Sequence, residues 1–221
     1  EIIKDRKPCL ERVFKILLNK PDEVVINTST FDLILTNVLR ECGAITHTIS
    51  IQDQHFLEKI EELLKQTKVR AIYVRPQCSF PERQTLTEAQ CIQLIELAKK
   101  YKTCILEEDE DHEFYYGPTF YKPLACYDHD GHVIYLGSLS MATTYTRSLR
   151  IIVASLQFMN AVQALPAQSI EQREVITEWA IADMILNGDL AIYQKTLRLN
   201  AKKDRHNLHL VLSNYLGEHL S

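Results

Sequence analysis

The chain has 221 residues, a net charge of −4 and a hydrophobic content of 46%, which is ordinary for a packed soluble protein. Basic and acidic residues are interspersed, so we do not expect this segment to bind nucleic acid by itself. No apolar run approaches the roughly 20 residues of a membrane span, and no basic-then-apolar leader is evident, so we expect a cytoplasmic protein without a membrane partner.

Six cysteines are present, none in a CxxC pair, and most lie in apolar contexts. We expect reduced, mostly buried thiols rather than a disulfide framework, as is usual in the cytosol. The first residue is Glu1 rather than methionine, so we expect this chain to be a trimmed or incomplete part of a longer protein.

Short β-rich runs alternate with helical patterns along the first two thirds of the chain. Gly43 is expected to end the first of these helices, Asp53 to cap the second, and Thr87 with Gln90 to form a capping box on the third. The pattern predicts strands over 23–27, 44–50, 69–74, 103–109, 132–138 and 149–155, and helices over 31–42, 53–66 and 87–101.

This alternation, with nearly continuous apolar strands, predicts an α/β fold of three layers. We expect a mainly parallel sheet of about six to seven strands with helices on both faces. The connection between the last two strands is hairpin-sized and could leave one strand antiparallel. Pro166 marks a boundary, and two long amphipathic helices with a break at Gly188 follow it. We therefore expect a sheet domain over 1–155 and a C-terminal helical segment over 156–221.

In such a sheet, ligands bind beyond the carboxyl ends of the strands. Four segments follow predicted strand ends and should therefore meet at one edge. They are residues 28–31, 75–80, 107–112 and 138–147.

Two stretches, ILEEDEDHEFYYG (105–117) and HVIYLGSLSMATTYTRSLRIIVAS (132–155), resemble the effector domain of MocR-type regulators of the GntR family. The family pattern reads roughly EDDYDSEFRY, then VIYxGTFSK, then PGLRLGYxVAP. YVRPQCSFPERQTLT (73–87) is similar to the family's TPSHQFPTGxxMS, and the resemblance continues in order over nearly the whole chain. Because those domains resemble fold-type I aminotransferases, the resemblance implies that large-domain fold.

Pyridoxal phosphate is the cofactor of this fold family, and the resemblance places its contact residues one by one. Met141 stands where the family has the imine-forming lysine, and a thioether offers no nucleophile. Glu108 stands for the aspartate that holds the pyridinium nitrogen, and Glu110 for the tyrosine beside the phenolic oxygen. Asp-Arg-Lys at 5–7 replaces the small GxQ phosphate loop. We therefore expect no covalently bound cofactor.

The family's phosphate-binding arginine falls at Ser148 in an ungapped alignment, or at Arg150 if the turn holds two extra residues. Residues two apart on a strand share a face, so Arg150 could aim where that arginine would, whereas Arg147 would aim away. With the hydroxyls of Ser138 and Ser140, Arg150 could still bind a phosphate or sulfate weakly. The resemblance thus implies a degenerate cofactor pocket without catalytic residues.

The acidic run at 107–113 ends in clustered carboxylates and a histidine, which also suit a metal ion. A strand end that turns into a solvated loop is the interpretation we favour, so no metal is expected. Without a cofactor, Glu108 and Asp111 are expected either to have raised pKa values or to pair with Arg75 or Arg147.

Other chemistry-bearing residues have plainer explanations. Lys122 and Lys195 do not lie at a predicted strand end, so neither is expected to replace the missing lysine. Cys78 has no assignable partner for nucleophilic chemistry. His206 and His209 are three apart on a long helix, but no third metal ligand is evident.

We therefore expect the effector-sensing or dimerisation module of a GntR/MocR-like transcriptional regulator, with a catalytically inactive aminotransferase-like domain. The resemblance implies a homodimer, an unknown small-molecule effector, and DNA contact only through an N-terminal winged helix-turn-helix that is absent from this chain. A degenerate or atypical pyridoxal-phosphate-dependent aminotransferase-like enzyme is the alternative. The family's small domain normally continues beyond Ser221.

Overall fold

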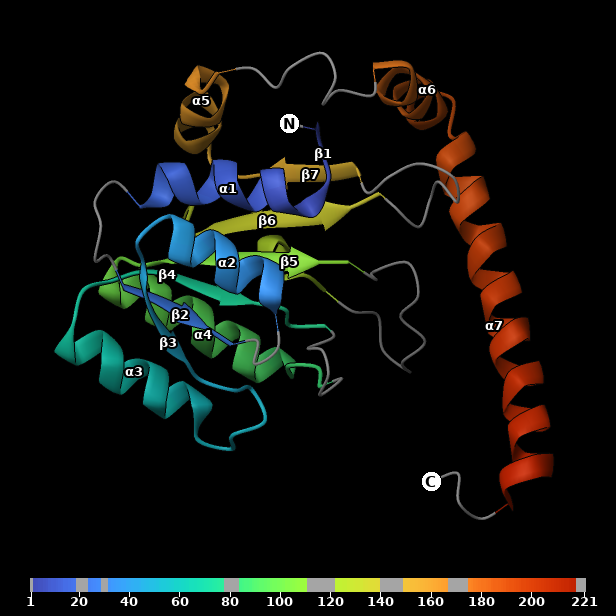
Figure 1. Cartoon of the computed structure of the whole chain (residues 1–221), viewed down its shortest axis with the longest axis horizontal. Coiled ribbons are helices and arrows are strands. Elements are labelled where there is room, and N and C mark those ends of the chain that lie inside the picture. Colours follow the sequence, from blue (N-terminus) through green and yellow to red (C-terminus); the bar gives the residue numbers. More distant parts are fainter. Residues whose placement is uncertain are drawn as a thin grey trace.

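The computed structural model describes residues 2–18, 24–28, 32–77, 84–110, 122–139, 149–166 and 175–217. Within them, one seven-stranded sheet lies between two layers of helices (Figure 1). The predicted α/β fold with a mainly parallel, helix-covered sheet is confirmed.

The sheet has the strand order β1-β7-β6-β5-β4-β2-β3. Neighbouring strands are parallel except for β7, which runs antiparallel to both β6 and β1. The hairpin-sized connection therefore does produce one antiparallel strand. The strands are β1 (Ile2–Lys4), β2 (Val24–Asn27), β3 (Ile45–Thr48), β4 (Val69–Val74), β5 (Cys104–Asp109), β6 (Val133–Ser138) and β7 (Leu149–Val153).

The helices divide between the two faces of the sheet. Helices α1 and α2 cover one face, with α5 beside α1, while α3, α4 and the short 3-10 helix η2 cover the other (Figure 1). The elements are α1 (Arg6–Leu17), α2 (Leu33–Glu41), α3 (Phe56–Gln66), α4 (Glu88–Tyr101), η2 (Leu124–Cys126), α5 (Leu156–Ala164), α6 (Val175–Leu186) and α7 (Asp189–Leu216).

The core forms one apolar cluster on each side of the sheet because side chains alternate along a strand. Ile105 of β5 packs with α3 and α4, while its neighbour Leu106 packs with α1 and α2. On β4, Ile72 and Tyr73 divide in the same way. The continuous apolar pattern of these strands follows from burial on both faces.

The predicted helix ends are confirmed at two of three positions. Thr87 and Gln90 form the expected capping box at the start of α4, and Gly43, at φ 71°, follows the end of α2. The predicted Asp53 cap is wrong, because α3 begins later, at Phe56. Asp53 instead accepts the N–H of His55 on its carboxylate at 2.9 Å and the N–H of Phe56 on its carbonyl at 2.9 Å, which forms the turn before the helix.

Strand β1 was not predicted from the sequence. Its three residues are too few to show an alternating pattern, and it is defined by pairing with β7, with Ile3 opposite Arg150. Its position at the sheet edge brings the chain directly into the start of α1.

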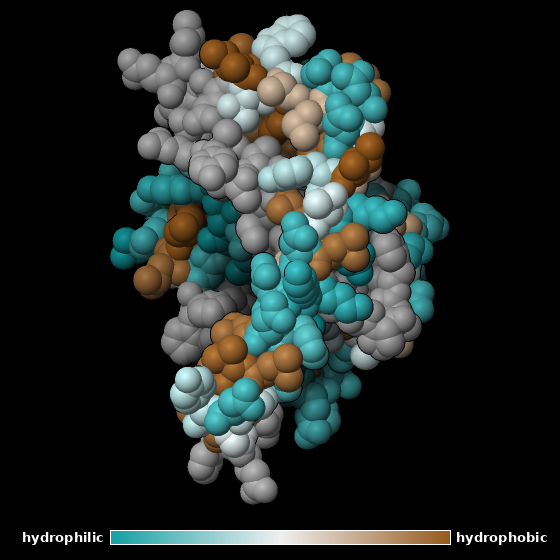
Figure 2. Space-filling view, turned by 90° about the vertical axis from the view of Figure 1, so that its right-hand side faces the viewer, coloured by the Kyte–Doolittle hydropathy of each residue, from teal (hydrophilic) through white to brown (hydrophobic). Residues whose placement is uncertain are grey.

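The C-terminal region contains the two expected helices, α6 of 12 described residues and α7 of 28, with their break at Gly188, which has a φ of 78°. Helix α5 lies within the segment expected to be helical, although its own bounds were not predicted. Arg12 of α1 fixes its C-terminal end by donating to the carbonyls of Val162 at 2.9 Å and Pro166 at 2.8 Å. The predicted division between 1–155 and 156–221 stays a prediction. Figure 2 shows apolar patches on the face that α7 presents, separated by hydrophilic side chains. In the described ranges, no helix combines the length and the apolar character that crossing a membrane requires.

The capping box of α4 allows a direct stability test. Thr87→Ala removes the acceptor for the N–H of Gln90 and should lower the free energy of unfolding by about 1 kcal/mol. Thr196→Ala is the matched control, because Thr196 is exposed inside α7 and its hydroxyl only returns to the carbonyl of Ile192. Urea unfolding of both variants measures the difference. Equal midpoints would contradict the cap.

Candidate functional site

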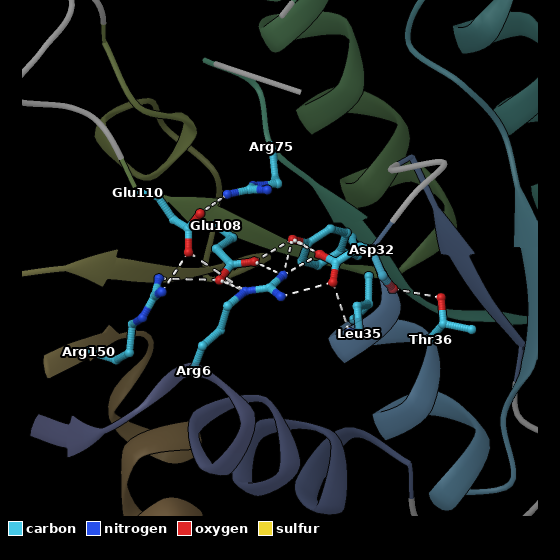
Figure 3. Close-up of polar contacts among 9 residues, drawn as sticks. Arg6, Asp32, Leu35, Thr36, Arg75, Glu108, Glu110 and Arg150 are labelled. Carbon is cyan, nitrogen blue, oxygen red and sulfur yellow. Dashed lines mark hydrogen bonds and ion pairs between the residues drawn. The ribbon is translucent and has the colours of Figure 1, made fainter. Parts of the chain in front are cut away.

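Seven polar side chains meet at the carboxyl ends of the central strands, on the face covered by α1 and α2 (Figure 3). They come from five elements that are distant in sequence. Arg6 begins α1, Asp32 precedes α2, and Arg150 lies on β7, while the other four come from β4, β5 and the residues that follow those strands. The cluster, called the arginine–carboxylate network below, comprises Arg6, Asp32, Tyr73, Arg75, Glu108, Glu110 and Arg150.

Glu108 lies at the centre of this network. Arg6 donates to it through two nitrogens, from Nε to Oε1 at 2.6 Å and from Nη2 to Oε2 at 2.7 Å. The hydroxyl of Tyr73 also donates to Oε2, and Nη1 of Arg150 donates to Oε1 at 3.4 Å. The side chain is 1% exposed. Both carboxylate oxygens of Glu108 are therefore occupied by groups of the chain itself.

The other edge of the Arg6 guanidinium binds Asp32. Nη1 donates to Oδ1 at 2.9 Å, and Nη2 donates to Oδ2. Asp32 also caps α2 by accepting the N–H of Leu35 at 3.0 Å. The planar guanidinium thus lies between two buried carboxylates and joins the first turn of α1 to the first turn of α2 and to β5.

Glu110 forms the outer end of the network. Nη2 of Arg150 donates to its Oε1 at 2.5 Å, and Nη2 of Arg75 donates to its Oε2. Nε of Arg6 lies 3.8 Å from Oε1. With 28% of its side chain exposed, Glu110 is the most accessible of the three carboxylates.

Three arginines and three carboxylates balance in charge, which matters because an unpaired buried charge costs several kcal/mol. Burial by itself raises the pKa of Asp32, but the hydrogen bonds from Arg6 and Leu35, together with the charges of Arg6 and Arg75, outweigh it, and the net pKa is lowered. Burial also raises the pKa of Glu110, but the charges of Arg75 and Arg150 and the hydrogen bond from Arg150 lower it, and the net pKa is lowered. Burial and the neighbouring Glu108 raise the pKa of Tyr73 well above its usual value, so this hydroxyl stays a neutral donor.

The backbone before Arg6 adopts a conformation that side chains rarely allow. Asp5 has φ 65° and ψ 151°, a region populated almost only by glycine, and such a residue typically costs about 1 to 3 kcal/mol. This turn carries the chain from β1 into α1 and sets Arg6 at the first helical position.

The structure brings together three of the sequence-predicted pocket residues, Glu108, Glu110 and Arg150. Ser138 is buried at the end of β6, in register with Arg150. Ser140, Met141, Arg147 and Ser148 lie outside the described residues. Their roles, including the loss of a lysine at Met141, therefore stay predictions.

The sequence by itself does not reveal the role of three members of the network, nor which charges pair. The sequence indicates Arg6 only as part of an altered phosphate loop, and it assigns no role to Asp32 or Tyr73. Of the two arginines expected as possible partners of Glu108, Arg75 binds Glu110 instead, while Glu108 pairs with Arg6 and Arg150. The other, Arg147, lies outside the described residues. An acidic residue just before a helix and a tyrosine in an apolar strand were the available signals.

The acidic run of β5 divides between the two faces of the sheet. Glu107 accepts the N–H groups of Leu124 at 2.8 Å and Ala125 at 2.9 Å and so caps η2 on the side opposite the network. Asp109 accepts the hydroxyl of Tyr135 at 3.1 Å. Among the described residues, no group of three or more histidine, cysteine or acidic side chains could hold a metal ion. Residues 111–113 lie outside that description.

The described residues do not fit the pyridoxal phosphate that the fold family uses. A ring nitrogen at Glu108 would need a carboxylate oxygen that Arg6 and Tyr73 already occupy. A phosphate at Arg150 would compete with Glu108 and Glu110 for its guanidinium. The groups that would hold the cofactor hold one another instead.

Removing the central cation should destabilise the fold strongly. Arg6→Met leaves Asp32 and Glu108 buried without their shared partner, and the free energy of unfolding should fall by about 3 to 5 kcal/mol. Lys7→Met is the matched control, because the neighbouring Lys7 makes only solvent-exposed pairs with Glu11 and Glu41. Chemical denaturation compares the two. Similar losses in both variants would contradict the network.

Lowering the pH should weaken the network and lower the free energy of unfolding. The pKa values of Asp32 and Glu110 lie below their ordinary values of 3.8 and 4.5, so their contribution is complete above those values and lost as pH falls through the lower, folded values. The free energy of unfolding should therefore decline below about pH 4.5. Glu110→Gln should decline less steeply, whereas the exposed Glu62→Gln should follow the wild type. Equal slopes for all three would contradict this assignment.

No family model matches the chain. The chain is 28% identical over 138 residues, 60% of its length, to aromatic-amino-acid aminotransferase 1 of Thermococcus litoralis, of which it spans 33%. It is 22% identical over 210 residues, 94% of its length, to the uncharacterised HTH-type transcriptional regulator YisV of Bacillus subtilis, of which it spans 43%. The regulatory protein MocR of Rhizobium meliloti is a further relative.

Among solved structures, an archaeal alanine:glyoxylate aminotransferase superposes with a TM-score of 0.83 over 98% of this chain at 24% identity. The chain covers 55% of that structure and less than half of the two relatives whose coverage is given above. The chain therefore has the fold-type I aminotransferase fold, and its relatives by sequence include both aminotransferases and MocR/GntR-type regulators.

Proposed function

We propose that the chain is the effector-sensing and dimerisation module of a GntR/MocR-like transcriptional regulator, built on a catalytically inactive aminotransferase-like domain. The similarity to a helix-turn-helix regulator supports this, because it extends along 94% of the chain. DNA binding would belong to a winged helix-turn-helix outside this chain. The working form would be a cytoplasmic homodimer that responds to a small molecule.

The observation that carries the non-catalytic part of the proposal is the arginine–carboxylate network. A site that transfers amino groups needs a carboxylate free to hold the cofactor ring and a cation free to hold its phosphate. Glu108 is 1% exposed and is held by Arg6, and Arg150 is engaged by Glu108 and Glu110. The fold is retained while its reaction centre is occupied by internal ion pairs.

The second candidate is a degenerate or atypical aminotransferase-like enzyme. The similarity that favours it is to the Thermococcus litoralis aminotransferase, at 28% identity over 60% of this chain. This alternative requires a lysine that reaches the cofactor and a site that opens at Glu108. Both requirements can be tested in solution.

The chain should not bind pyridoxal phosphate covalently. Imine formation needs an unprotonated amine within reach of the aldehyde, and Met141 is expected to offer a thioether at that place. After incubation with pyridoxal phosphate and removal of the excess, no visible absorption band should remain before or after borohydride treatment. Met141→Lys should be insufficient by itself, because Glu110 and the altered phosphate loop remain. A stoichiometric band fixed to one lysine of the natural sequence would favour the enzyme.

The regulator is tested on a protein extended by the coding sequence upstream of Glu1. We expect that sequence to encode a basic helix-turn-helix, and the extended protein to bind DNA upstream of its own gene in a mobility-shift assay. The 221-residue chain is the control and should not bind, since its net charge is −4. A thermal-shift screen then identifies the effector, because a ligand of the native state raises apparent stability. An extended protein without affinity for DNA would contradict the regulator.

A further inference from the structure

We propose that Arg6 is a built-in occupant of the cofactor site, and that it excludes a protonated ring from Glu108 independently of the residue at position 141. The chain would thus carry two separate barriers to the cofactor of its fold family. The barrier expected at Met141 is the loss of a reactive group, whereas the barrier at Arg6 is a side chain that fills the site.

The first support is the chemistry of the contact. A guanidinium is a planar cation, as is a protonated pyridine ring, and it presents parallel N–H donors to a carboxylate. Arg6 uses Nε and Nη2 on Glu108 at 2.6 and 2.7 Å and Nη1 on Asp32 at 2.9 Å. All three nitrogens of the guanidinium therefore donate to the two buried carboxylates, and the Tyr73 oxygen lies 3.1 Å from Nη2.

The second support is the backbone that aims Arg6. Asp5 holds a positive φ of 65°, and the following residue enters α1 with its side chain directed into the site (Figure 3). Strained backbone persists only where the surrounding structure determines it. In this chain, the turn at Asp5 places Arg6 so that it makes four hydrogen bonds to Asp32 and Glu108.

The third support is the pairing of Glu110 with two arginines at the outer end of the network. Glu110 lies between Arg75 and Arg150, so the cation best placed for a phosphate already has an internal anion. Glu110 is also the most accessible carboxylate of the network, at 28% exposure. The site is therefore filled by a tethered cation at Glu108 and a tethered anion at Arg150. Opening it requires removing both side chains.

The test uses pyridoxamine 5′-phosphate as the probe, because it carries an amine in place of the aldehyde and needs no lysine. Binding to the wild type, Arg6→Ala, Arg6→Ala/Glu110→Gln and the control Lys7→Ala is measured by equilibrium dialysis. The wild type and Lys7→Ala should bind the probe only weakly and with equal affinity. The double variant should bind at least about tenfold more tightly than the wild type, a difference of about 1.4 kcal/mol.

Tight binding by the wild type, or a folded double variant that binds no better than the wild type, would overturn the proposal. A second measurement covers variants that fold poorly. Ethylguanidinium should raise the melting temperature of Arg6→Ala, because it restores a planar cation between Asp32 and Glu108, while the neutral ethylurea should not. The absence of this selective rescue would also overturn it.

The inference rests on the proposed non-catalytic function only for its biological meaning. If the extended protein fails to bind DNA while the double variant gains the probe, the regulator is wrong and the occupied site stands. If DNA is bound and the variants gain nothing, the regulator stands and Arg6 has only a structural role.

Discussion

The fold of this chain depends on where one guanidinium lies. Arg6 is buried between Asp32 and Glu108, and it is the cation that the two carboxylates share. Because Asp32 also caps α2 and Glu108 lies on a central strand, this single side chain couples the starts of two helices to the middle of the sheet. Arg150 extends the coupling to the antiparallel strand β7.

This arrangement shows how the carboxyl edge of an aminotransferase fold can be held together by side chains of the chain alone. A cofactor bound at the carboxyl edge of a sheet neutralises charges there and joins the elements that surround it. In this chain three arginines and three carboxylates supply both effects internally. The sheet and its helical layers keep their geometry, as the TM-score of 0.83 against a solved aminotransferase indicates. This internal pairing is the feature on which the proposed non-catalytic role rests.

The acidic run at the end of β5 illustrates how one strand serves both sides of the sheet. Successive side chains point to opposite faces, so Glu107 caps η2 while Glu108 enters the network. A cluster of acids in the sequence is therefore divided in space. The metal site that such a cluster can suggest requires the carboxylates to converge, and these two neighbours diverge.

The sequence by itself determined the layered α/β fold and most element positions, because burial on both faces leaves continuous apolar strands and amphipathic helices leave a 3.6-residue period. It also indicated the edge at which Glu108, Glu110 and Arg150 meet, since parallel strands place their carboxyl ends together. Only the tertiary structure decided which charges pair. Arg6 and Glu108 are 102 residues apart, and no local pattern links them. The short β1 and the positive φ of Asp5 direct Arg6 inward, and both depend on pairing with β7 and packing that only the folded chain provides.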